Sequence, residues 1–297
     1  MTAALAHVRQ FDVTLPDGRD LHAYEGGDPA GALVVYHSGT PMSGLLERDW
    51  AADARRRGIR LVGYDRAGYG GSTRRQGRTV ADVAGDVAAV ADFLGVDRFF
   101  TWGVSGGGPH ALACAALLGD RVIAAAAVAS VAPYDANGLD FLGGMGQDNV
   151  DEFGAALEGE QALRPYLTAQ TAELLEVSPE NLGDAMASVL PPVDKDALTG
   201  DAADFLHGTM TSGLRHSCDG WLDDDLAFVS PWGFDVGSIA VPLLVVQGEQ
   251  DLMVPFAHGR WLAAAIPSAT VRLMADEGHL SLFARIPEVH GWLLGQA

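Results

Sequence analysis

The feature that most constrains this chain is the turn at 103–107, which reads Gly-Val-Ser-Gly-Gly and has Ser105 at its centre. The apolar run 99–102 leads directly into the turn, and a small-residue stretch of helical character, 108–113, follows it. Strand, sharp turn and helix are the three parts of a nucleophile elbow. Strand and helix backbones nearly touch in such a turn, so glycine is needed two residues before and two residues after the serine, at Gly103 and Gly107.

Candidate partners for Ser105 follow two later strand patterns. The apolar run 242–246 leads into a loop that contains Asp251, and the run 270–274 is followed closely by His279. A hydroxyl group becomes a good nucleophile when a base takes its proton and a third group orients that base. We therefore predict Ser105 as nucleophile, His279 as base and Asp251 as acid, in the chain order of one particular fold.

With these segments the chain resembles the α/β-hydrolase family. The segments that carry the resemblance are 103–107, 248–251 and 278–279, together with 37–41 and 65–72. The segment 37–41 resembles the family's His-Gly oxyanion loop, with Ser38 between His37 and Gly39. The segment 65–72 resembles the loop that follows the family's fourth strand. The resemblance covers roughly residues 8 to 132 and 233 to 295.

The expected fold is of the α/β class. Strand and helix patterns alternate along the chain, which predicts a mostly parallel sheet covered by helices on both faces. The resemblance implies the α/β-hydrolase fold with eight strands and an inserted, mainly helical cap. We expect residues 1–133 and 233–297 to form the core and residues 134–232 to form the cap over the active site.

The oxyanion hole is expected to have two donors. The Gly106 N–H is the first, because the amide after the nucleophile lies at a helix N-terminus and faces the developing charge. By resemblance the second comes from the His37 loop. Thr40, which precedes Pro41, is the first choice, and Gly39 is the alternative because Ser38 shifts the register of the loop.

Other residues compete for these roles. Asp135 is the rival acid, since it follows the strand ending near Ser130 and some members of the family carry their acid there. We expect His110 to be a packed or capping residue. We expect His37 to hold the oxyanion loop by a hydrogen bond. We expect His216 and His258 to lie on the solvated surface, and the alternative is that they face the pocket.

The net charge of −20 argues against nucleic acid and anionic membranes as partners. Most of this charge lies in the expected cap, where residues 134–232 hold nineteen acids against three bases, or −16. Its run Asp223, Asp224 and Asp225 is expected to be solvated. The functional alternative is a site for a substrate ammonium group.

Composition gives the expectations for compartment, cofactors and partners. Cys114 and Cys218 supply no disulfide framework and no metal-ligand spacing, so we expect a cytoplasmic protein without metal or cofactor. Met1–Gln10 has no apolar core long enough for a signal peptide. Asp120 and its neighbours interrupt the most apolar stretch, which favours a helix followed by a buried strand over a membrane span. The expected partner is a small-molecule substrate. The sequence leaves open whether the protein forms a homodimer.

The predicted activity is hydrolysis of a small ester, amide or related acyl compound through an acyl-enzyme. A proline-iminopeptidase-like aminopeptidase is the enzymatic alternative. A non-catalytic, ligand-sensing protein on the same fold is the alternative of another class, and turnover separates the two.

Overall fold

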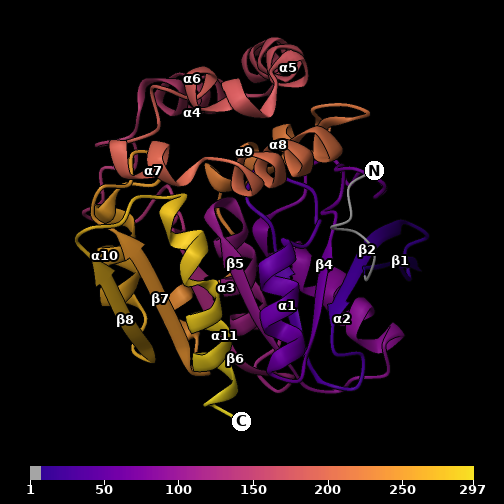
Figure 1. Ribbon diagram of the computed structural model, residues 1–297. Helices are drawn as coiled ribbons and strands as arrows, with labels where there is room; N and C mark the ends of the chain where they lie inside the picture. Colours follow the sequence, from indigo (N-terminus) through magenta and orange to yellow (C-terminus); the bar gives the residue numbers. More distant parts are fainter. Residues whose placement is uncertain (1–7) are drawn as a thin grey trace.

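An eight-stranded sheet runs through the computed structural model of the chain, which describes residues 8–297 (Figure 1). The strand order is β1-β2-β4-β3-β5-β6-β7-β8, with β1–β2 and β2–β4 antiparallel and all later neighbours parallel. The strands are β1 (Arg9–Thr14), β2 (Asp20–Gly27), β3 (Ala32–His37), β4 (Ile59–Tyr64), β5 (Phe99–Val104), β6 (Val122–Val128), β7 (Leu243–Gly248) and β8 (Ala269–Met274). The signal-peptide expectation for Met1–Gln10 falls mostly outside the described residues.

Helices cover both faces of this sheet, as predicted. They are α1 (Arg48–Arg56), α2 (Val83–Phe93), α3 (Gly108–Leu117), α10 (Phe256–Ala265) and α11 (Ile286–Leu294). Successive strand side chains point to opposite faces: in β3, Val34 and Tyr36 pack in the core with α1 and α11, whereas Val35 packs in the core with α2, α3 and α10. The predicted α/β-hydrolase architecture is confirmed.

Capping fixes where α1 begins. The Glu47 carboxylate accepts a hydrogen bond from the Trp50 N–H at 2.8 Å, so the helix starts at Arg48. A 3₁₀ segment, Ser281–Arg285, leads from the His279 loop into α11.

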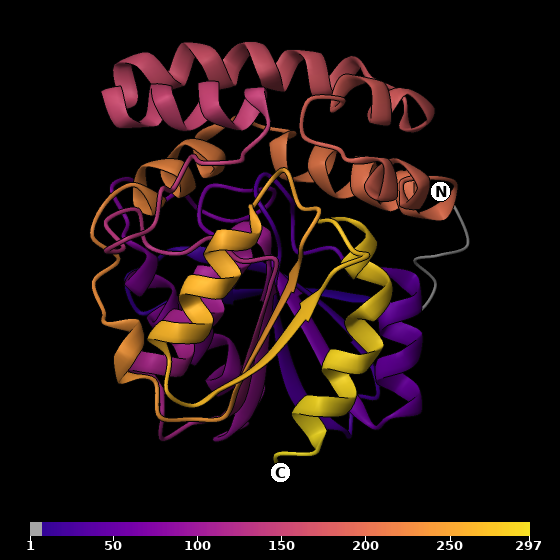
Figure 2. The ribbon, with the colours of Figure 1, turned by 90° about the vertical axis from the view of Figure 1, so that its left-hand side faces the viewer.

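Six further helices form an insertion between β6 and β7. They are α4 (Gln147–Glu158), α5 (Glu160–Glu176), α6 (Leu182–Ala185), α7 (Pro192–Ala197), α8 (Asp201–Leu214) and α9 (Asp219–Phe228). We call residues 147–228 the helical insertion. Figures 1 and 2 show it across the carboxyl ends of the parallel strands, with α8 and α9 next to the sheet and α4 and α5 outside them. No helix in the described part of the chain is long and apolar enough to cross a membrane.

The two outer helices of the insertion, α4 and α5, have 12 and 17 residues. Gly154 and Pro165 lie inside these helices and weaken the local helical pattern, so packing between the helices has to supply the stability that propensity does not.

Gly213 allows α8 to approach the loop after β3 closely. We call the sheet together with α1, α2, α3, α10, α11 and their connecting loops the sheet domain. A Cβ at Gly213 would lie 2.7 Å from the Pro41 carbonyl oxygen and 2.9 Å from the Ser43 nitrogen. Gly208 lies in the same helix, and a Cβ there would meet nothing within 4 Å. The two glycines therefore form a matched pair for testing this contact.

We expect Gly213→Ala to lower the free energy of unfolding by about 1–3 kcal/mol, since the added methyl group collides with backbone atoms. Gly208→Ala should raise it by about 0.4–1 kcal/mol through helix propensity and a less flexible unfolded chain. Urea unfolding of both variants measures the difference. Equal effects of the two substitutions would contradict the close approach of α8.

Candidate active site

The turn after β5 has the geometry of an elbow. Ser105 has φ of +55°, in the left-handed region that costs an L-residue energy and that persists where the surroundings enforce it. A Cβ at Gly103 would collide with the Gly107 carbonyl, as expected. A Cβ at Gly107 would collide instead with the carbonyls of His37 and Ser38, so this glycine also admits the loop after β3.

His110, in the first turn of α3, stabilises the elbow by a hydrogen bond. Its ring is fully buried, and its Nδ1 lies 2.8 Å from the Gly106 carbonyl oxygen, to which it donates a hydrogen bond. Burial and the nearby Arg66 lower the pKa of His110 to about 3, so the ring is neutral. His110 is thus a packed residue, as expected.

His279 and Asp251 form a buried pair at the ends of β8 and β7. The His279 Nδ1 lies 2.7 Å from Asp251 Oδ2 and donates to it. The same carboxylate accepts from the Met253 N–H at 2.8 Å, the Val254 N–H at 2.7 Å and the Gln247 amide at 3.1 Å. Because Nδ1 carries the donated proton, Nε2 of the neutral ring is free to accept one.

Two opposing effects set the pKa of His279. Burial alone would lower it, but the charge and hydrogen bond of the Asp251 carboxylate outweigh burial and raise the pKa above its ordinary value. The rival acid Asp135 is exposed, and its carboxylate makes no hydrogen bond with His279 in the structure as described.

Two other histidines differ from the expectations. The predicted loop-holding role of His37 is wrong in detail: its Nε2 donates to Thr101 Oγ1 at 2.9 Å and its Nδ1 faces the Tyr64 hydroxyl at 3.0 Å, so its bonds go to neighbouring strands. His258 is fully buried rather than solvated, and it bonds Ala132 N and the Phe141 carbonyl. His216 is exposed, as expected.

Asp194 supports the His279 loop, a role that the sequence did not suggest. Its buried carboxylate accepts from the His279 N–H at 2.7 Å and the Ser281 N–H at 2.9 Å. It comes from α7, 85 residues earlier in the chain. Nothing in the local pattern around Asp194 distinguishes it from the many solvated acids of the same segment.

Arg66 holds the loop that contains Thr40. Its guanidinium donates to the carbonyls of Ser38 and Gly39, the latter at 3.3 Å. Across a trans peptide the N–H points away from the preceding carbonyl. The Gly39 carbonyl faces Arg66, so the Thr40 N–H is directed to the opposite side.

Asp224 joins the helical insertion to this loop. Its carboxylate accepts from Arg66 at 2.5 Å, from Arg78 at 2.6 Å, from the Tyr69 hydroxyl at 2.8 Å and from Thr40 Oγ1 at 2.7 Å. Burial would raise the pKa of Asp224, but the two guanidiniums hold it far below its usual range. We call these five residues the Asp224 cluster.

The predicted solvated acidic run at 223–225 is therefore wrong. All three aspartates are at least 98% buried. Asp223 bonds Arg74 at 2.8 and 2.9 Å, and Asp224 belongs to the cluster just described. The negative charge of the insertion is thus partly neutralised by arginines of the sheet domain. Asp225 alone of the three lines a cavity.

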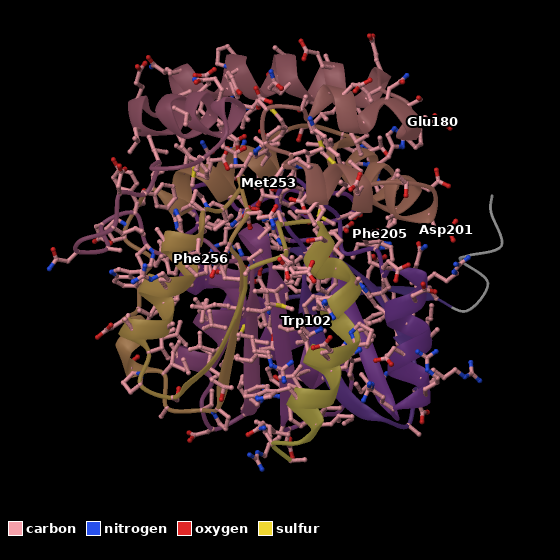
Figure 3. The ribbon with its side chains drawn as sticks, turned by 60° about the vertical axis from the view of Figure 1, so that its left-hand side comes forward. Trp102, Glu180, Asp201, Phe205, Met253 and Phe256 are labelled. Atoms are coloured by element: carbon pink, nitrogen blue, oxygen red, sulfur yellow. The ribbon has the colours of Figure 1, made fainter. Side chains whose placement is uncertain are left out.

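That cavity, of about 150 Å³, lies between the sheet edge and the helical insertion. Its lining includes Ser105, Gly106, Thr40 and His279 but not Gly39. Met253, which also lines it, is labelled between the two layers in Figure 3, whereas Trp102 lies deep in the sheet. Most of the remaining lining is apolar: Pro41, Met42, Val131, Phe153, Leu174, Met186, Val189, Leu206, Met210, Trp221, Phe228, Val254, Leu280 and Phe283.

Comparison with known proteins decides the family. The model of the alpha/beta hydrolase fold family matches residues 32–285. The chain belongs to the α/β-hydrolase fold family. No group of three or more His, Cys, Asp or Glu side chains suited to a metal ion occurs within residues 8–297.

The matching relatives are named for several different activities. The chain is 35% identical over 255 residues to the bifunctional esterase/perhydrolase DCH of Acinetobacter calcoaceticus, covering 82% of this chain and 83% of that one. It is 28% identical over 262 residues to the dihydrolipoyllysine-residue acetyltransferase component of the acetoin cleaving system of Cupriavidus necator, and the match covers 88% of this chain but only 61% of that protein. Non-heme haloperoxidases and proline iminopeptidases also match.

A solved structure supports the fold. Bromoperoxidase from Bacillus anthracis matches with a TM-score of 0.71 at 20% identity, covering 97% of this chain and 99% of that chain. At this identity the likeness concerns the fold alone.

We expect the His279 ring to titrate above about 6.5, the ordinary histidine pKa, because Asp251 stabilises its charged form. Asp251→Asn removes that charge, so the pKa should fall below the wild-type value. Asp135→Asn should leave it unchanged. NMR titration of the histidine ring measures all three, and a shift on Asp135→Asn in place of Asp251→Asn would reverse the assignment.

Proposed function

We propose that this protein is a serine hydrolase that cleaves a small ester or related acyl compound through an acyl-enzyme. The observation that carries the proposal is the strained Ser105, which shares one cavity with His279, a histidine oriented by the Asp251 carboxylate. The esterase name of the relative at 35% identity supports the same reaction class.

In the proposed mechanism the Ser105 hydroxyl oxygen attacks the substrate carbonyl carbon while His279 Nε2 takes the hydroxyl proton. The charged imidazole that results is stabilised by the Asp251 carboxylate, which stays ionised. His279 then gives the proton to the leaving group, and the acyl group remains on Ser105. Water that loses a proton to His279 attacks the acyl carbon. The bond between that carbon and the Ser105 oxygen then breaks, His279 returns the proton to the Ser105 oxygen, and the acid is released.

The negative oxygen of each tetrahedral intermediate would be bound by the Gly106 and Thr40 N–H groups. Gly106 follows the nucleophile at the start of the helical turn, where amide groups are unsatisfied. Thr40 is favoured over Gly39 because Thr40 lines the cavity and its N–H is directed away from Arg66. Loss of one such donor typically costs about 3–4 kcal/mol of transition-state stabilisation.

The helical insertion would act as the cap in this proposal. Its helices contribute much of the apolar lining, including Phe153, Trp221 and Phe228. An apolar lining excludes water and binds the apolar parts of a small substrate beside the nucleophile. The cavity volume of about 150 Å³ fits a compact substrate.

The experiment is covalent labelling combined with turnover. A fluorophosphonate should attach to Ser105, and Ser105→Ala should lose the label together with about 10³-fold or more of the hydrolysis of short p-nitrophenyl esters, because the members of a triad act as a unit. Peptide mapping by mass spectrometry locates the adduct.

Ser268→Ala is the matched control. Ser268 lies at the opposite end of β8 from His279, and its hydroxyl makes one hydrogen bond, to the Ile239 carbonyl at 3.2 Å. Label and turnover should survive this substitution. An adduct on another serine would refute the nucleophile assignment. Stoichiometric labelling of Ser105 without turnover of esters, lactones or amides would favour the ligand-sensing alternative.

A further inference from the structure

Two acidic side chains of the helical insertion face the same cavity as Ser105. Glu152 comes from α4 and Asp225 from α9. Asp225 is only 1% exposed, and its side-chain neighbour is the carboxyl group of Glu152, with which it forms a hydrogen bond when the two share a proton. No N–H or hydroxyl donor among residues 8–297 lies within hydrogen-bonding distance of either Asp225 oxygen. Two buried acids that face each other without a cation are costly, so the fold alone does not account for this pair.

No cationic side chain among residues 8–297 forms a hydrogen bond with Glu152 or Asp225. Glu152 accepts a hydrogen bond from the Trp221 indole at 2.8 Å, and Asp148 adds a third acid to the cavity lining. Arg78 is the cation that acts on Asp225, but its guanidinium bonds Asp224 at 2.6 Å and the Gly220 carbonyl at 3.2 Å.

The pKa values of Glu152 and Asp225 are both raised in this environment. Burial raises the pKa of Glu152 to about 7. Burial and the charge of Glu152 raise the pKa of Asp225 well above its ordinary value. Two neighbouring carboxyl groups in a buried site hold a proton between them unless a cation enters.

The helix that carries Asp225 also contacts the proposed reaction centre. The neighbouring Asp224 accepts from Thr40, and a Cβ on Gly106 would lie 3.1 Å from the Phe228 ring. A group bound by Asp225 would therefore lie close to the scissile carbonyl, within the same small cavity.

We propose that Glu152 and Asp225 bind a protonated amine of the substrate, so that the enzyme prefers esters or amides that carry an ammonium group near the scissile carbonyl. An ammonium has three N–H donors, and the two Asp225 oxygens with the second Glu152 oxygen supply three acceptors. This inference rests on the proposed hydrolase function, because the amine belongs to the substrate that Ser105 attacks.

The test compares two methyl esters of equal size, those of alanine and isobutyric acid, which differ by an ammonium in place of a methyl group. At neutral pH the wild type should show a higher kcat/KM for the alanine ester. Asp225→Asn and Glu152→Gln should each lower the ratio of the two kcat/KM values by about 10- to 100-fold, the effect of one charge-assisted hydrogen bond. The ratio between variants cancels the intrinsic reactivity of the amino ester.

Asp140→Asn is the charge-matched control, since Asp140 is exposed and does not line the cavity. It should leave the ratio unchanged. A ratio unchanged in Asp225→Asn and Glu152→Gln, with both esters still hydrolysed, would overturn the amine site and leave the hydrolase standing. A ratio that rises in these variants would also overturn it, because the acids would then serve a neutral substrate.

Calorimetric titration with isopropylammonium chloride keeps the inference testable if neither ester is cleaved, an outcome that counts against the hydrolase function instead. The wild type should bind isopropylammonium, and Asp225→Asn should bind it at least about tenfold more weakly if one charge-assisted hydrogen bond is lost. Equal binding by wild type and Asp225→Asn would refute the amine site independently of catalysis.

Discussion

The buried ion pair between Arg66 and Asp224 is the interaction on which the rest of this structure depends. The two residues lie 158 positions apart, one in the sheet domain and one in the helical insertion. Arg66 also binds the carbonyls that precede Thr40, and Asp224 also accepts from Thr40 itself. Two buried charges are stable together only when both are fully hydrogen-bonded, so the insertion and the loop that contains Thr40 hold each other in place.

Three consecutive aspartates of α9 have three different environments because a helix turns by about 100° per residue. Asp223 faces Arg74 near the surface, Asp224 faces the buried guanidiniums, and Asp225 faces the cavity. Only the last has no N–H or hydroxyl donor for its carboxylate among residues 8–297, and its neighbour is another acid, Glu152. The same short helix thus fastens the insertion to the sheet domain and supplies the acid proposed to select the substrate.

The sequence predicted the sheet, the elbow and the pairing of His279 with Asp251 because these depend on local patterns. Strand alternation, glycines around Ser105 and the positions of acids after strands are all visible within a few residues. Asp194, Asp224 and Glu152 were not predicted, since their partners come from distant segments and their local sequence is that of any solvated helix. The prediction that the acidic run at 223–225 is solvated was wrong for the same reason, because its arginine partners lie some 150 residues earlier in the chain.

The role of Asp224 in holding both the insertion and the loop that contains Thr40 is tested most directly by Asp224→Asn beside Asp223→Asn. Asp224→Asn leaves two buried guanidiniums without their counter-charge and should lower the free energy of unfolding by about 3–5 kcal/mol. It should also slow fluorophosphonate labelling of Ser105 by more than about tenfold, towards the 10²–10³-fold cost of a lost oxyanion donor. Asp223→Asn should have small effects on both, because Arg74 is 25% exposed and also pairs with Asp219. Equal effects of the two substitutions on stability and labelling would contradict the claim.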